Sequence, residues 1–105
     1  MPANANPARV INMSLGGGGA CDTTTQNAIN SARSRGTVVV VAAGNENTDA
    51  SSSNPANCAG VVTVAATNRS GGRAYYSNYG TVVDVAAPGG DVRTAGGGIL
   101  STLNA

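Results

Sequence analysis

Four consecutive valines, Val38 to Val41, constrain the fold of this chain more than any other feature of its sequence. A strand with one wet side alternates apolar and polar residues, whereas a continuous valine run is typical of a parallel strand that is covered on both faces. The segments VVTVAAT (residues 61–67) and TVVDVAAPGG (81–90) have the same character, and GGGILSTLNA (96–105) is expected to add a short edge strand. The sequence therefore predicts an α/β fold built on a parallel sheet.

The residues before the valine run complete a strand–helix–strand unit. ARVINMSL (8–15) is rich in strand-forming residues, and apolar side chains recur with helical spacing between residues 28 and 32. Asp22 or Thr23 is suited to cap the start of this helix, and Gly36 to end it. Such a βαβ unit has a right-handed crossover in nearly all proteins.

Small side chains make up the apolar part of the chain. Hydrophobic residues fill 41% of the 105 positions without any Phe or Trp, so Ala and Val carry most of the core. Burial of one Val contributes roughly 1.5–3 kcal/mol, while ordering each residue costs about 1.5 kcal/mol. A core of this kind is marginal alone, and we expect the chain to belong to a larger protein.

Charge and hydropathy argue against several classes of function. Lys+Arg 6 against Asp+Glu 5 gives a net charge of +1, which suggests neither a nucleic-acid partner nor binding to an anionic membrane surface. No apolar run reaches the ~18 residues of a transmembrane helix. The first ten residues lack the basic and apolar regions of a signal peptide.

Irregular residues gather where the predicted strands end. Residues 15–17, 43–45 and 87–89 follow three of these strands, and ligands of open α/β sheets bind beyond the carboxyl ends of strands. Asn45 lies at the end of the valine strand, where a core element needs no carboxamide. An asparagine at this position is expected if a site requires a hydrogen-bond donor on a rigid support. The polar segment 45–60 is too long for a simple connection, which predicts a functional or disordered loop.

The sequence lacks the residues that phosphate binding and triad catalysis require. Starting from the glycines of 16–19, the third glycine position of G-x-G-x-x-G falls on Cys21 or Asp22, so this spacing fails, and no Lys follows to form a P-loop. The sequence has no His and no G-x-S-x-G motif, so it contains no nucleophile–base pair. Its carboxylates are scattered, which is typical of solvated loops, although one carboxylate with loop carbonyls can hold a hard cation.

Two cysteines, Cys21 and Cys58, leave two interpretations open. They are either two buried thiols or one disulfide formed in an oxidising compartment. Metal binding by two lone cysteines without a histidine is poorly supported.

Five motifs occur in the order VINMSLGG, VVVVAAGNEN, VVTVAAT, YSNYG and VDVAAPGG. Their sequence and spacing closely resemble the subtilisin-like serine proteases (subtilases), most of all the secreted bacterial branch that includes proteinase K–like enzymes. The resemblance covers residues 8–103 and implies a three-layer, parallel-sheet α/β subtilisin-like fold, here partial and truncated. It identifies residues 1–105 as a central fragment of the catalytic domain of a secreted, extracellular serine endopeptidase.

The resemblance also implies catalytic and substrate-binding residues. Asn45, in Ala-Ala-Gly-Asn, matches the family's oxyanion-hole asparagine, whose side-chain NH₂ donates to the tetrahedral intermediate. Glu46 falls at the base of the specificity pocket, where a carboxylate would favour a basic substrate side chain. One pocket wall, which also pairs with the substrate backbone, is Ser14, Leu15 and Gly16, and the opposite wall is Ala42, Ala43 and Gly44.

Two structural features follow from the same resemblance. Asp84 matches a position that in several relatives binds a Ca²⁺ or Na⁺ ion, here with the carbonyls of Ala59 and Val61; the alternative is an aspartate that bonds to loop amides. Cys21 and Cys58 lie in two loops that some bacterial relatives bridge, which favours a disulfide between them. No cofactor is required for the chemistry itself.

Departures from the family limit what these residues can do alone. The family's catalytic Asp and His lie upstream of the first strand, and its Ser lies in a Gly-Thr-Ser-Met-Ala stretch further on. We expect a fragment that is inactive alone, whose partners are a polypeptide substrate and the missing N- and C-terminal parts of the protease domain. Exposed sheet faces also predict self-association. The alternatives are a catalytically dead α/β module that binds extended peptides along residues 14–16, and a structural piece that folds only by assembly.

Overall fold

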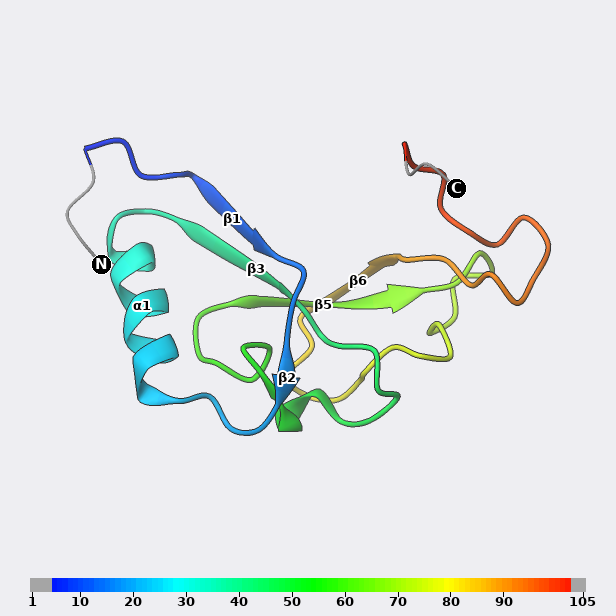
Figure 1. Ribbon diagram of the computed structural model, residues 1–105, viewed down its shortest axis with the longest axis horizontal. Helices are drawn as coiled ribbons and strands as arrows, with labels where there is room; N and C mark the ends of the chain where they lie inside the picture. The colour runs from blue at the N-terminus through cyan, green and yellow to red at the C-terminus, as the bar shows by residue number, and fades with distance from the viewer. Residues whose placement is uncertain (1–4, 103–105) are drawn as a thin grey trace.

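The computed structural model describes residues 5–102 of the chain (Figure 1). The elements, in chain order, are β1 (Val10–Met13), β2 (Gly17–Gly18), α1 (Thr23–Ser34), β3 (Val38–Ala42), the 3₁₀ helix η1 (Ala50–Ser52), β4 (Ser53–Asn54), β5 (Val62–Thr67) and β6 (Val85–Pro88). Four strands form one sheet, while the two-residue strands β2 and β4 pair separately.

The main sheet is parallel throughout, in the order β1-β3-β5-β6. Val40 of β3 lies opposite Asn12 of β1 on one side and Val62 of β5 on the other, so the valine strand is paired along both edges. The predicted α/β fold with a parallel sheet is therefore confirmed. The edge strand expected near the end of the chain does not form in residues 96–102, and residues 103–105 lie outside the described residues.

Helix α1 begins and ends where the sequence indicated. The Asp22 carboxylate accepts hydrogen bonds from the hydroxyl of Thr25 (2.6 Å) and from its N–H (3.3 Å). These bonds favour the ionised carboxylate and lower the pKa of Asp22, the hydroxyl having the larger effect. Gly36 follows the last turn at a φ of +86°, a left-handed conformation that glycine adopts without steric cost. No helix within residues 5–102 is long and apolar enough to cross a membrane.

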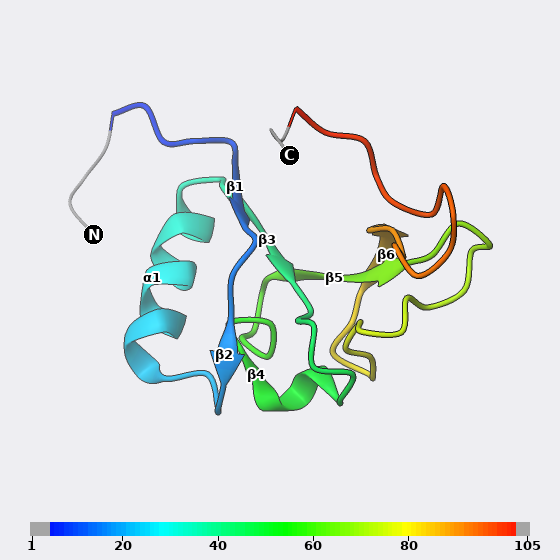
Figure 2. The ribbon, with the colours of Figure 1, turned by 45° about the vertical axis from the view of Figure 1, so that its right-hand side comes forward.

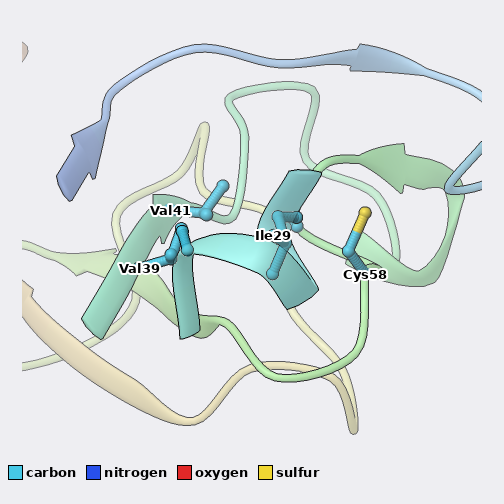
Figure 3. Close-up of a cluster of buried hydrophobic side chains, with 6 residues drawn as sticks. Ile29, Val39, Val41 and Cys58 are labelled. Atoms are coloured by element: carbon cyan, nitrogen blue, oxygen red, sulfur yellow. The ribbon is translucent and has the colours of Figure 1, made fainter. Parts of the chain in front are cut away.

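The main core lies between α1 and the sheet. Figures 1 and 2 show α1 alongside β1 and β3. Ile29 of α1 packs with Val39 and Val41 of β3, beside the buried Cys58 (Figure 3). These side chains are small, as the composition predicted, and Val39 and Val41 are 2% and 1% exposed.

The other face of the sheet is more open than the valine run predicted. Side chains alternate across a strand, so Val38, Val40 and Ala42 point away from α1. Val38 is 49% exposed, and every residue of β6 is exposed as well. Cover on both faces is therefore wrong for the described residues, because α1 is the only α-helix among them and it lies on one side.

Two loops also differ from the expectations. The strand predicted from residue 81 begins only at Val85, because the N–H of Val83 bonds to the carbonyl of Gly80 (3.2 Å) and closes a turn. The segment 45–60 is folded into η1 and β4, and β4 pairs antiparallel with the two glycines of β2. Glycine has a low strand propensity, so this pairing has no signal in the sequence.

Replacement of Ile29 by alanine should lower the free energy of unfolding by about 2–5 kcal/mol, because it leaves a cavity between α1 and β3. Ile29→Val removes one methylene group and should cost about 0.5–1.5 kcal/mol. Denaturant unfolding of both variants gives the comparison. Equal costs for the two substitutions would show that the packing in Figure 3 does not limit stability.

Candidate functional site

A cleft of about 270 Å³ lies where the four parallel strands end. Its lining includes Ser14 after β1, Gly44 and Asn45 after β3, Ala66 of β5, and Gly89 after β6. All three irregular segments that follow strands in the sequence therefore contribute to this cleft or to the one beside it. This is the position in which open α/β sheets bind ligands.

A second, smaller cleft of about 90 Å³ shares part of this lining. It brings together all the residues that the family resemblance placed in the specificity pocket. The lining comprises Ser14, Leu15, Gly16, Gly17, Ala42, Ala43, Gly44, Asn45, Glu46, Ser53, Asn54 and Ala56. Two segments that are almost 30 residues apart in sequence thus face the same space, because β1 and β3 are neighbours in the sheet.

Asn45 lines both clefts and is exposed. Its backbone N–H donates to the Glu46 carboxylate (3.2 Å). Its carboxamide makes no hydrogen bond to any residue in the described part of the chain, so both N–H groups of the side chain are available to a ligand. The strand before it is paired on both sides, which leaves the donor on a stiff support.

The turn that carries Asn45 is held by Asn78, a residue to which the sequence analysis gave no role. Asn78 is fully buried, and its side-chain oxygen accepts from the N–H groups of Glu46 (2.9 Å) and Thr48 (3.1 Å). Its side-chain nitrogen donates to the carbonyl of Ala43 (2.9 Å) and to the Glu46 carboxylate (3.0 Å). The signal in the sequence was the motif YSNYG, which contributed only to the family resemblance.

Glu46 places a carboxylate in the smaller cleft. One of its oxygens accepts from the Asn78 side chain (3.0 Å) and the other from the N–H of Asn45 (3.2 Å). The residue is otherwise exposed. A negative charge is thereby held at a defined place beside walls made mainly of small residues.

Two of the three residues expected to bind a cation, Asp84 and Ala59, are already engaged with protein groups. The Asp84 carboxylate accepts from the N–H of Thr63 (2.8 Å), and the Ala59 carbonyl accepts from the side chain of Gln26 (2.9 Å). Ca²⁺ takes six to eight oxygen ligands, and this set offers one exposed carboxylate and the carbonyls of Ala59 and Val61. These contacts fit the alternative interpretation better, an aspartate that bonds to a backbone amide, and the cation site stays a prediction.

The other loop carboxylates have local partners. Asp49 accepts from the N–H of Ser51 (2.9 Å), which lowers the pKa of Asp49. Asp91 bonds to the guanidinium of Arg93 (2.8 Å), and this hydrogen bond is the main reason that the pKa of Asp91 is lowered. Residues 5–102 contain no group of three or more His, Cys, Asp and Glu side chains that could hold a metal ion.

Cys21 and Cys58 form a disulfide, with 5.2 Å between their Cα atoms, which confirms the implied pairing. It joins the segment after β2 to the segment after β4, and the Asn57 side chain adds a bond to the carbonyl of Gly19 (2.9 Å). A bridge between residues 37 positions apart contributes roughly 3–4 kcal/mol in the chain-entropy model. The loops beside the smaller cleft are therefore tied together covalently.

A parallel α/β sheet with a cleft at the carboxyl ends of its strands is the arrangement in which open α/β proteins bind ligands, and the sequence comparison identifies the family. Residues 2–105 match the Subtilase family of peptidases (peptidase S8). The chain belongs to this family.

Relatives that share half or more of the aligned residues with this chain include two extracellular proteases. An extracellular protease of Xanthomonas campestris pv. campestris is 64% identical over 104 residues, which are 99% of this chain and 17% of the relative. An extracellular basic protease of Dichelobacter nodosus is 50% identical over 104 residues, or 99% of this chain and 16% of the relative. The chain therefore spans about a sixth of the length of the curated relatives it matches.

Solved structures give the same fold. A protease from Pseudoalteromonas arctica is 70% identical, with a TM-score of 0.81 over 86% of this chain and 26% of its own. A cold-adapted subtilisin-like serine proteinase is 42% identical, with a TM-score of 0.69 over 75% of this chain and 28% of its own. The subtilisin-like fold predicted from the motifs is therefore confirmed over part of its length.

Replacement of Gly44 by alanine should lower the free energy of unfolding by more than about 1 kcal/mol. Gly44 has a φ of +109°, and a Cβ there would collide with the side chains of Asn78 and Glu46. Gly18→Ala is the matched control, because a Cβ at that position would meet nothing within 4 Å and its φ is not positive, so its cost should stay within about 0.5 kcal/mol. Equal unfolding midpoints for the two variants would contradict the packing of the turn.

Proposed function

We propose that this chain is the central part of a secreted subtilisin-like serine endopeptidase, to which it contributes the oxyanion donor and the specificity pocket. The observation that carries this proposal is the unpaired carboxamide of Asn45 at the junction of two clefts. A preorganised donor stabilises charge that develops in the transition state without waiting for water to reorganise.

In the proposed reaction a serine hydroxyl attacks the peptide carbonyl carbon, and the carbonyl oxygen becomes an oxyanion. The side-chain N–H of Asn45 donates to this oxyanion, and the peptide bond to the leaving amine then breaks to give an acyl-enzyme. The base that accepts the serine proton and passes it to the leaving amine lies outside these 105 residues, since they contain no histidine. We therefore propose that residues 1–105 do not hydrolyse peptides by themselves.

The smaller cleft is the proposed specificity pocket. A substrate in extended conformation would pair with the backbone of residues 14–16 and place one side chain between the two walls. The walls consist mainly of small residues, while Glu46 contributes a carboxylate. This combination favours a side chain with an apolar stem and a positive end, as in Lys or Arg.

Secretion is supported by two observations. The Cys21–Cys58 disulfide fits an oxidising compartment, and two relatives bear the name of extracellular proteases. We extend this location to the protein that contains this chain.

A module that binds peptides without cleaving them is the second candidate, and the absence of histidine from these residues favours it. Both candidates place a polypeptide in the same clefts, and only the first requires turnover.

Self-association through the open sheet face, where Val38 and Val85 are about half exposed, also stays a prediction. No step of the proposed chemistry passes through a cation.

Asn45→Ala in the full-length protein should lower kcat roughly 10²–10³-fold with a smaller change in KM, a magnitude taken from the corresponding loss in subtilisin, itself a member of this family. Steady-state kinetics on a peptide substrate measure it. Asn27→Ala is the control, because Asn27 is an exposed asparagine on α1 outside both clefts, and its kcat should be unchanged. Equal turnover in the two variants would contradict the role of Asn45, and peptide binding without turnover in the unmodified protein would favour the second candidate.

Glu46→Gln removes the charge from the smaller cleft and keeps the shape of the side chain. The ratio of kcat/KM for a lysine substrate to that for a leucine substrate should fall roughly 2- to 5-fold, because an exposed ion pair contributes up to about 1 kcal/mol. The fall should be smaller at high salt, where exposed charges are screened. A ratio that does not change would show that the carboxylate does not contact the substrate side chain.

A further inference from the structure

We propose that Asn78 is a positioning residue that fixes the turn bearing Asn45, so that the Asn45 carboxamide meets the oxyanion. This inference rests on the proposed function. It concerns a residue 33 positions away in sequence that has no place in the lining of either cleft.

The contacts of Asn78 bracket Asn45 on both sides. Before it, the Asn78 side chain donates to the carbonyl of Ala43 (2.9 Å), and its backbone N–H donates to the carbonyl of Gly44 (3.0 Å). After it, the Asn78 side-chain oxygen accepts from the N–H groups of Glu46 (2.9 Å) and Thr48 (3.1 Å). One buried amide thus fixes the backbone immediately before and after Asn45, while the Asn45 side chain itself stays unpaired.

Burial makes these bonds a stiff support. Asn78 is 0% exposed, so water does not compete for its hydrogen bonds, and a buried polar group left without partners is costly. Ser77, 1% exposed, links Asn78 to the sheet, because its hydroxyl accepts from the N–H of Ala66 in β5 (2.9 Å) and donates to the Asn78 carbonyl (3.0 Å). The turn after β3 is therefore held in place by β5 as well as by its own strand.

The outer side of the same turn is braced by Arg73. Its guanidinium donates to the side chain of Asn47 (2.7 Å) and to the carbonyl of Ser77 (2.8 Å), and it lies 4.9 Å from the ring centre of Tyr79. Asn47 itself has a left-handed φ of 51°. The turn is thus held from both sides by residues 73–79, and Asn78 is the only one of these residues whose side chain reaches the backbone on both sides of Asn45.

Loss of Asn78 should therefore act on turnover through Asn45. An oxyanion donor acts in the transition state, so misplacing it lowers kcat more than it raises KM. A displacement of about 1 Å at a reacting group can cost on the order of 10²-fold in rate. A residue that only stabilised the fold would lower the amount of active protein and leave kcat per active site unchanged.

The test is a double-mutant cycle in the full-length protein, with kcat expressed per titrated active site. Asn78→Ala should lower kcat about 10- to 100-fold. In the Asn45→Ala background the same substitution should change kcat by less than about 2-fold, because the donor that it positions is already gone. Effects that multiply would overturn the inference, since Asn78 would then act independently of Asn45.

Thr37→Val is the matched control at the opposite end of β3. Thr37 is buried and its hydroxyl donates to the carbonyl of Ala8 (2.6 Å), so the substitution removes one partly buried hydrogen bond, far along the strand from the turn. Its kcat per active site should stay within about 2-fold of the unmodified protein. A loss equal to that of Asn78→Ala would show that any weakening of β3 lowers turnover, and would also overturn the inference.

Asn78→Asp is a second variant of the same shape, which keeps the oxygen that accepts from the turn. It loses the donation to Ala43 and faces the Glu46 carboxylate, so kcat should again fall without a further fall in the Asn45→Ala background. If neither Asn78 variant yields folded protein, Asn78 is a folding residue and the inference fails. If Asn45→Ala leaves kcat unchanged, the proposed function fails. If instead the effects of the Asn45 and Asn78 substitutions on kcat multiply, only the positioning role of Asn78 fails.

Discussion

The pairing of β3 with a parallel strand on each side is the constraint on which the rest of the structure depends. β1 and β5 bond to its two edges, and α1 packs on Val39 and Val41. These contacts leave the strand no freedom to shift, so they set the point at which the chain leaves the sheet after Ala42. The turn that follows begins from a fixed place, and Asn45 is three residues beyond it. A binding or catalytic group on a rigid element is placed more accurately than one on a free loop.

Polar side chains provide much of the rigidity near the clefts. The four largest of the fully buried side chains in residues 5–102 are Val41, Asn78, Thr63 and Ser77, and three of these are polar. The apolar residues around them are mostly alanines, which bury little surface. Hydrogen bonds in a buried, low-dielectric environment are strong and directional. Directional bonds hold a turn in one conformation, which small apolar side chains cannot do.

The sequence predicted the parts that depend on local pattern. The valine run, the cap at Asp22 and Gly36 after the helix all appear where they were expected, because periodicity and capping act over a few residues. Motif order led to the residues of the smaller cleft and to the disulfide. Predictions that needed a neighbour in space did less well. The second face of the sheet, which was expected to be covered, is open, because no local pattern specifies what lies against it.

What the sequence alone determined is the α/β class, the approximate positions of the main strands along the chain and the chemical identity of the groups beside the clefts. The tertiary structure decided which of these groups are free and which are held. Asn45 and Asn78 carry the same carboxamide, yet one is exposed and unpaired while the other is buried with every polar atom bonded. Every residue has similar backbone N–H and C=O groups, so only the packing of distant segments determines which of them an amide reaches.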